Sequence, residues 1–214
     1  MRVCFVSEGG LDACVGEEAD IILFGFNVAK EVRYEKELAG ESRFFEDAAL
    51  LSKKSKSVVV CGCVTDTRGH KRKSAIVAEN GKLLGVSDMT HVVDGEVGSG
   101  VGLRVYETRV GKMGVAVAED IRFPSVIKSL AVCGSDFIVC PYENAEAIHA
   151  VLIRAHAYCY GVPVLFCGRG RCMIAAANGD LAFASPESRQ SVDFQIEKEY
   201  HLVETRRRFT LHGN

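Results

Sequence analysis

Residues 114–124 read Gly-Val-Ala-Val-Ala-Glu-Asp-Ile-Arg-Phe-Pro, an apolar run that ends abruptly in charge. The apolar part is typical of a buried strand. Beyond it, apolar residues recur at the spacing of one helix face, at Val126, Ile127, Leu130 and Ala131. In α/β proteins such a strand-to-helix elbow lies at the carboxyl end of a strand, where small-molecule sites form. The stretch therefore predicts an elbow beside a site.

The composition limits the classes of protein to consider. The chain has 214 residues, of which 48% are hydrophobic and 25% charged, and this is ordinary for a globular domain with a sizeable core. A formal net charge of -2 gives no basis for binding nucleic acid or a membrane surface. Apolar runs fall well short of the roughly 20 residues of a membrane span. We expect one domain over residues 1–214 that binds neither nucleic acid nor a membrane.

Nine cysteines are scattered through the chain, mostly inside apolar runs, and they form no Cys-x-x-Cys pair. The odd number and apolar settings favour reduced core thiols in the cytoplasm over a disulfide framework. The first residues, 1–6, are typical of a strand rather than a secretory signal. Cys61-Gly62-Cys63 is a weak metal-ligand pattern that core thiols explain better, and the six histidines have no metal-ligand spacing. We therefore expect no metal and no cofactor.

The predicted order of elements is a strand, a helix and a hairpin, and this order occurs twice along the chain. Helices are expected at 42–55, 125–133 and 145–160, and a loop at 27–40. Strands are expected at 2–7, 19–26, 58–64, 73–79, 82–86, 103–108, 112–118, 136–141, 164–167, 172–176, 181–184 and 192–196. The Asn80-Gly81 pair suits a type I′ hairpin turn. The helix at 145–160 is expected to face its sheet with Ile148, Leu152, Ala155 and Cys159.

The stretch 114–124 resembles the nucleophile elbow of the nitrilase (carbon–nitrogen hydrolase) superfamily, roughly Gly-x-x-Ile-Cys-Tyr-Asp-x-Arg-Phe-Pro-Glu. Residues 19–26 resemble the family's Ala-Asp-(apolar)-Pro-Glu strand, which ends in the general base. Residues 85–92 resemble its Gly-x-x-x-Lys-x-His-Leu segment, which carries the catalytic lysine. The resemblance covers nearly the whole chain. It implies an α/β fold, a four-layer α-β-β-α sandwich in a single domain.

The resemblance places three apolar residues where the family has its catalytic triad. Phe26 stands at the glutamate position, Met89 at the lysine position and Ala118 at the cysteine position. In the family the glutamate activates the thiol, the thiolate attacks carbon and the lysine stabilises the oxyanion. Without the cysteine, a buried glutamate and lysine would be costly charges, and apolar side chains fill that space instead. We expect a pseudoenzyme with a structural, ligand-binding or regulatory role.

A hydrolase with a relocated active group is the alternative. Glu119 could act as an acid or base, but pairing with Arg122 or another basic residue is the more common fate of such a glutamate. Cys140 could act as a nucleophile, but a buried thiol is more common. Asp120 and Arg122 match framework residues and are expected to hold the turn. Glu96 is carried over as an additional acidic residue of the pocket.

The resemblance also implies pairing of two copies through the helices at 125–133 and 145–160. The second helix offers Ala147, Val151 and Tyr158 on a face beside the one assigned to the sheet. An apolar stripe of that width exceeds what one sheet contact needs. We therefore predict a homodimer. A small-molecule ligand is compatible with the fold, but the sequence names none.

Overall fold

The protein is described by a computed structural model covering residues 1–28, 31–93, 95 and 97–197. Its strands form two sheets. The first has the order β13-β1-β2-β4-β5-β6 with β3 beside β4, and the second has the order β12-β11-β10-β9-β8-β7. The strands are β1 Arg2–Val6, β2 Ile21–Phe24, β3 Val32–Arg33, β4 Val58–Thr67, β5 His70–Glu79, β6 Lys82–Asp88, β7 Val105–Thr108, β8 Gly111–Val115, β9 Phe137–Asn144, β10 Val164–Arg169, β11 Arg171–Ala175, β12 Leu181–Ser185 and β13 Arg189–Asp193.

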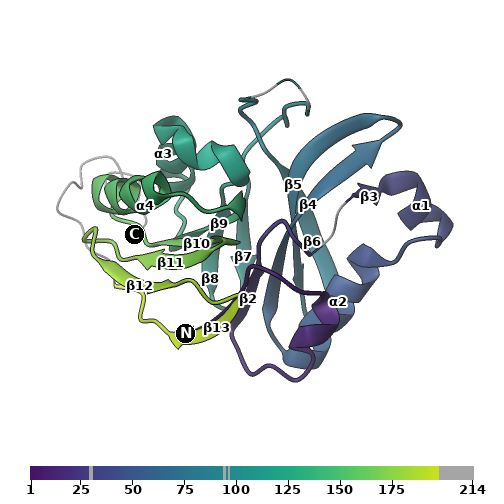
Figure 1. Cartoon of the computed structure of the whole chain (residues 1–214), viewed down its shortest axis with the longest axis horizontal. Coiled ribbons are helices and arrows are strands. Elements are labelled where there is room, and N and C mark those ends of the chain that lie inside the picture. Colours follow the sequence, from purple (N-terminus) through teal and green to yellow (C-terminus); the bar gives the residue numbers. More distant parts are fainter. Residues whose placement is uncertain (29–30, 94, 96, 198–214) are drawn as a thin grey trace, which may run out of the picture.

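Helices cover the outer faces of both sheets (Figure 1). The helix α2 (Phe44–Ser55) packs on the first sheet, and α3 (Pro124–Val132) and α4 (Ala147–Tyr160) pack on the second. This is the predicted four-layer α-β-β-α arrangement. The shorter elements are α1 (Tyr34–Ala39) and two 3₁₀ helices, η1 (Leu11–Cys14) and η2 (Ala118–Arg122). Within the described residues, no helix has the length and apolar character needed to cross a bilayer.

Alternation along the strands divides the core into three layers. In β1, Val3 and Phe5 belong to the layer between the sheets, whereas Cys4 and Val6 belong to the layer under α2. Successive side chains of a strand point to opposite faces, so a strand buried on both faces must be apolar throughout. The third layer lies between the second sheet and the helices α3 and α4.

Several expected boundaries were wrong, among them those of the following three segments. Residues 27–40 contain β3 and α1 rather than only loop, and α1 buries none of its six residues, so no apolar pattern reveals it. The strand β9 continues through Pro141 to Asn144, with Pro141 beside Cys167 of β10. The last strand, β13, covers 189–193 instead of 192–196. The predicted turn is confirmed, because Asn80 and Gly81 both have positive φ, 53° and 80°.

The face of α4 that packs on the second sheet was also predicted wrongly. Its buried residues are His149, Ile153, His156 and Ala157, whereas Ile148 and Cys159 are exposed. The two histidines explain the error. The ring of His149 packs against Tyr142 and Phe166, and the Nε2 atom of His156 lies 2.9 Å from the Ile121 carbonyl oxygen. A hydropathy pattern does not count such histidines as core, so the expected stripe was displaced by one residue.

Candidate functional site

The elbow between β8 and α3 has a strained backbone at one residue. After β8 the chain enters η2 at Ala118, which has φ of 48°, and α3 begins at Pro124. Left-handed φ is uncommon for a residue other than glycine and costs roughly 1–2 kcal/mol. Such strain persists only where the surroundings enforce it, and it clusters at functional sites. The residue at this sharp turn, where a nucleophile would stand, has a methyl side chain.

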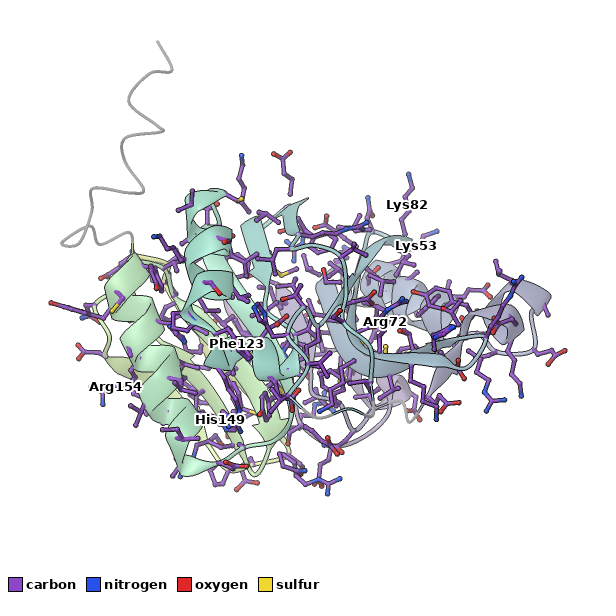
Figure 2. All side chains as sticks on the ribbon, turned by 90° about the horizontal axis from the view of Figure 1, so that it is seen from above. Lys53, Arg72, Lys82, Phe123, His149 and Arg154 are labelled. Carbon is purple, nitrogen blue, oxygen red and sulfur yellow. The ribbon has the colours of Figure 1, made fainter. Side chains whose placement is uncertain are left out.

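Asp120 fixes this elbow to the chain that follows β6. Its carboxylate, 1% exposed, accepts hydrogen bonds from the Thr90 backbone N–H at 2.9 Å, the Thr90 hydroxyl at 2.8 Å and the His91 backbone N–H at 3.0 Å. The ring of His91 stacks on Phe123 with centroids 4.1 Å apart. Figure 2 labels Phe123 in the half of the molecule that contains α3 and α4. These contacts hold Met89, the residue before Thr90, beside the elbow.

The three positions that the sequence matched to a catalytic triad lie in one apolar cluster between the sheets. Phe26, Met89 and Ala118 are 8%, 1% and 1% exposed and belong to the same core cluster. The Phe26 ring packs over Gly62 of β4, where an added Cβ would lie 2.4 Å from a ring carbon. Five surface cavities in the described part of the chain are lined by other residues than these three. The site is filled by side chains of the protein itself.

A lysine and a glutamate stand beside this apolar cluster. The Met89 backbone N–H donates to the Lys73 carbonyl oxygen at 2.8 Å, so Lys73 lies opposite Met89 on the neighbouring strand. The Lys73 Nζ donates to Glu119 Oε1 at 2.8 Å, and the two side chains are 16% and 17% exposed. The other carboxylate oxygen, Glu119 Oε2, is buried and lacks a hydrogen-bond partner among the described residues. Glu119 thus pairs with a basic residue, Lys73, that the sequence did not indicate.

Arg122 forms its contacts with Tyr142 and Glu146 rather than an ion pair with Glu119. Its Nη2 atom donates to the Tyr142 hydroxyl oxygen at 3.3 Å and lies 3.9 Å from a carboxylate oxygen of Glu146. The Tyr142 ring also packs against His149, whose Nδ1 accepts the Glu146 backbone N–H at 2.8 Å. Burial, with a further contribution from Arg122, lowers the pKa of His149. Arg122 therefore connects the elbow to the beginning of α4.

Cys140 lies under the elbow rather than at an accessible surface. It is fully buried in β9, and its Sγ donates to the Ala118 carbonyl oxygen at 3.9 Å. Burial and the nearby carboxylates Asp120 and Glu119 raise the pKa of the Cys140 thiol well above its usual range. The thiol is therefore protonated at neutral pH, and the geometry favours a core role. Glu96, the remaining candidate, lies outside the described residues.

Comparison with known proteins identifies the family. A model of the carbon-nitrogen hydrolase family matches residues 17–198. The chain belongs to the carbon–nitrogen hydrolase family. A probable nitrilase of Schizosaccharomyces pombe is 26% identical over 162 residues, which span 70% of this chain and 59% of that protein. The chain thus matches less than two thirds of the length of this curated relative.

Solved structures share the fold of this carbon–nitrogen hydrolase homologue. Nit3 of Saccharomyces cerevisiae, a member of branch 10 of the nitrilase superfamily, has a TM-score of 0.75 at 15% identity and covers 100% of this chain and 95% of its own. A cysteine-to-alanine variant of the amidase from Nesterenkonia sp. AN1, in complex with butyramide, has a TM-score of 0.71 at 16% identity, covering 89% of this chain and 88% of its own.

The site of this chain has two parts, a framework that holds the elbow and the side chains that surround it. The Asp120 contacts and the left-handed residue at 118 form the framework of the elbow. The side chains that resemblance assigns to chemistry are apolar, and a Lys73–Glu119 pair stands one strand away from Met89. The sequence motif predicted the elbow between β8 and α3, and the assignment of the triad positions stays a prediction. It did not locate Lys73, because the partner of Met89 depends on the register of the β5–β6 hairpin.

Proposed function

We propose that this carbon–nitrogen hydrolase homologue has no amidase or nitrilase activity and acts as a structural, ligand-binding or regulatory protein. One observation carries the proposal. The residue at the turn of the elbow, Ala118, has a methyl side chain that is 1% exposed. A methyl group has no lone pair with which to attack a carbonyl or nitrile carbon, so the covalent intermediate of the family cannot form there.

The other two replaced positions support the same proposal. A general base must accept a proton, and an oxyanion needs a hydrogen-bond donor or positive charge in a preorganised place. The side chains of Phe26 and Met89 supply neither. Both are buried in the cluster that contains Ala118, so they occupy the volume that a substrate would need.

A hydrolase with relocated groups is the second candidate, and the Lys73–Glu119 pair is the observation that favours it. Glu119 follows Ala118 directly, and its buried Oε2 has no partner among the described residues. Such a carboxylate could accept a proton from a water molecule beside Lys73. Cys140 is the weaker alternative, because its buried thiol stays protonated.

The first prediction is an absence of turnover. Purified protein incubated with butyramide, an aliphatic nitrile and an N-carbamoyl amino acid should release ammonia at the rate of buffer alone, while an active family amidase assayed in parallel releases it readily. Butyramide is chosen because a related amidase binds it after its cysteine is replaced by alanine. Calorimetry with butyramide on the same sample tests separately for ligand binding.

Three variants assign any activity that is found. Turnover that disappears in Glu119→Gln or Lys73→Met would establish the relocated pair and overturn the proposal. Turnover that disappears only in Cys140→Ala would point to the thiol. Activity that survives all three would place the active centre elsewhere in the chain. We propose that the protein acts in the cytoplasm, because its nine cysteines are an odd number of free thiols and seven of them are buried.

A further inference from the structure

Two thiols in the β10–β11 hairpin lie in direct contact. Cys167 and Cys172 are register partners in this antiparallel pair, and their sulfur atoms are 3.7 Å apart. Both residues are fully buried in the core layer between the sheets. The chain reverses tightly between them, with Gly170 at φ of 82°. The pair is separate from the elbow, and the role proposed above does not use it.

The backbone around these thiols suits a disulfide without rearrangement. Directly opposed residues of an antiparallel pair have Cα atoms about 4.5–5.5 Å apart, and disulfides span Cα separations of about 4.4–6.8 Å. Both strands are held in register by the hairpin, so rotation of the two side chains brings the sulfurs toward each other. The sulfurs must then close from 3.7 Å to a bonded separation of about 2.0 Å.

The surroundings of the two sulfurs give them different roles. The hydrogen bond with Cys167 lowers the pKa of the Cys172 thiol, and the Ser7 hydroxyl lowers it further. Burial raises the pKa of Cys167. The thiolate is the nucleophilic form of cysteine, so Cys172 is the sulfur that reacts first with an oxidant. Cys167 then stands in contact with it as the resolving thiol.

We propose that Cys167 and Cys172 form a reversible intramolecular disulfide, so that the hairpin is a two-electron couple that reacts with hydroperoxides. The Cys172 thiolate attacks one peroxide oxygen, which gives a sulfenic acid and releases hydroxide, and this takes up a proton to become water. The Cys167 sulfur then displaces the hydroxyl from the sulfenic sulfur, forming the S–S bond and a second water. The two thiols and one hydrogen peroxide thus become one disulfide and two waters. A dithiol reductant reverses the oxidation.

Because neither cysteine has exposed surface, the size of the oxidant decides whether it can reach the sulfurs. A small neutral peroxide can enter a packed core during local fluctuations, whereas a bulky disulfide such as oxidised glutathione cannot approach in line with the sulfur. We therefore expect hydrogen peroxide to form the bond at least tenfold faster than oxidised glutathione at equal concentration. The exposed thiols Cys133 and Cys159 should react with both.

The test uses the full chain in its folded state. Cys159→Ser is introduced first, because Cys159 is exposed and shares a tryptic peptide with Cys167. After peroxide treatment and alkylation of the remaining thiols in denaturant, trypsin should yield peptide 155–169 joined to peptide 172–189. A dithiol should separate them. Peptide 57–68, which holds the buried Cys61 and Cys63 on one strand, serves as the internal control and should stay doubly alkylated.

Two variants and one spectrum make the result decisive. The joined peptides should be absent in Cys172→Ser and, as an independent check, in Cys167→Ala. They should form while the circular-dichroism signal of the folded chain is unchanged. Failure of peptides 155–169 and 172–189 to join while Cys133 is oxidised would overturn the proposal. So would a link that forms only as the chain unfolds, or oxidation of Cys61 and Cys63 to the same extent.

Discussion

At Ala118 a strained turn of the backbone carries a side chain that is only a methyl group. Its φ of 48° is the strained geometry expected of a residue that must project a side chain from a sharp turn. The bonds that enforce it, from Thr90 and His91 to Asp120, do not involve the side chain at 118. The contacts that hold the elbow are therefore independent of the side chain at position 118.

This strain predicts an unusual response to glycine. Ala118→Gly removes a buried methyl but also relieves the left-handed penalty, because glycine adopts positive φ freely. Ala116→Gly removes an equally buried methyl at a position without positive φ, so it has no such compensation. We expect the loss in free energy of unfolding to be about 1–2 kcal/mol smaller for Ala118→Gly, measured by urea denaturation. Equal losses would show that the elbow is not strained.

The contact between Lys73 and Glu119 could not be predicted from the sequence. The motifs predicted that Phe26, Met89 and Ala118 lie together and that Glu119 lies at the elbow, since matched spacing carries that information. The residue opposite Met89 depends on pairing between β5 and β6, whose register shifts by one residue between Val77 and Ala78, and this residue, Lys73, is the partner of Glu119. Without that irregularity the hairpin would place a different residue opposite Met89. A bulge has no dependable sequence signal, so the ion pair became visible only in three dimensions.

At the scale of elements, α4 is fixed to the elbow through a histidine. His156 is 5% exposed, and its Nε2–H donates to the Ile121 carbonyl oxygen in η2 at 2.9 Å. The sequence predicted this helix and its end, because Gly161 and Pro163 bar its continuation. It did not predict which face is inward, since two of the four buried residues are histidines. Tertiary contacts, rather than hydropathy, decide which face of α4 points toward the sheet.

This contact predicts a loss of stability at acidic pH. Burial lowers the pKa of His156 in the folded state, whereas in the unfolded chain it titrates near about 6.5. As the pH falls through about 6.5, the unfolded chain gains a proton that the folded chain does not, so stability is full above this pH and declines below it. His156→Gln keeps an N–H donor but does not titrate. As the pH falls, the free energy of unfolding of His156→Gln should therefore decline less steeply than that of the unmodified chain, by up to about 1.4 kcal/mol per pH unit.

Urea unfolding of both proteins between pH 5 and pH 8 measures this difference. The two curves of unfolding free energy should run parallel above about pH 7 and diverge below about pH 6.5. His149, whose pKa is also lowered, is unchanged in both proteins and contributes equally to each curve. Curves that stay parallel down to pH 5 would contradict a buried neutral His156.

At the scale of the whole molecule, the rotation of α4 leaves an apolar face uncovered. Ile148, Val151 and Tyr158 are 45%, 60% and 45% exposed on this helix. The sequence assigned Ile148 to the sheet and Ala147, Val151 and Tyr158 to a second face, so the exposed Ile148 adds to the apolar surface that faces solvent. Exposed apolar patches on otherwise globular proteins mark interaction surfaces. Because α4 lies on the outside of the sandwich, a second copy could pack there along a two-fold axis (Figure 1).

We therefore predict a two-fold symmetric homodimer that buries on the order of 1,000 Å² or more through α4. Val151→Glu should shift the protein to monomer, because it would force a charge into an apolar contact with no partner. Leu38→Glu is the matched control, since Leu38 is an apolar residue of α1, 89% exposed, on the helical layer of the other sheet. Sedimentation at tens of micromolar should show a dimer for the unmodified chain and for Leu38→Glu, and a monomer for Val151→Glu. A monomeric unmodified chain would refute the dimer, and a dimer that withstands Val151→Glu would place the interface on another face.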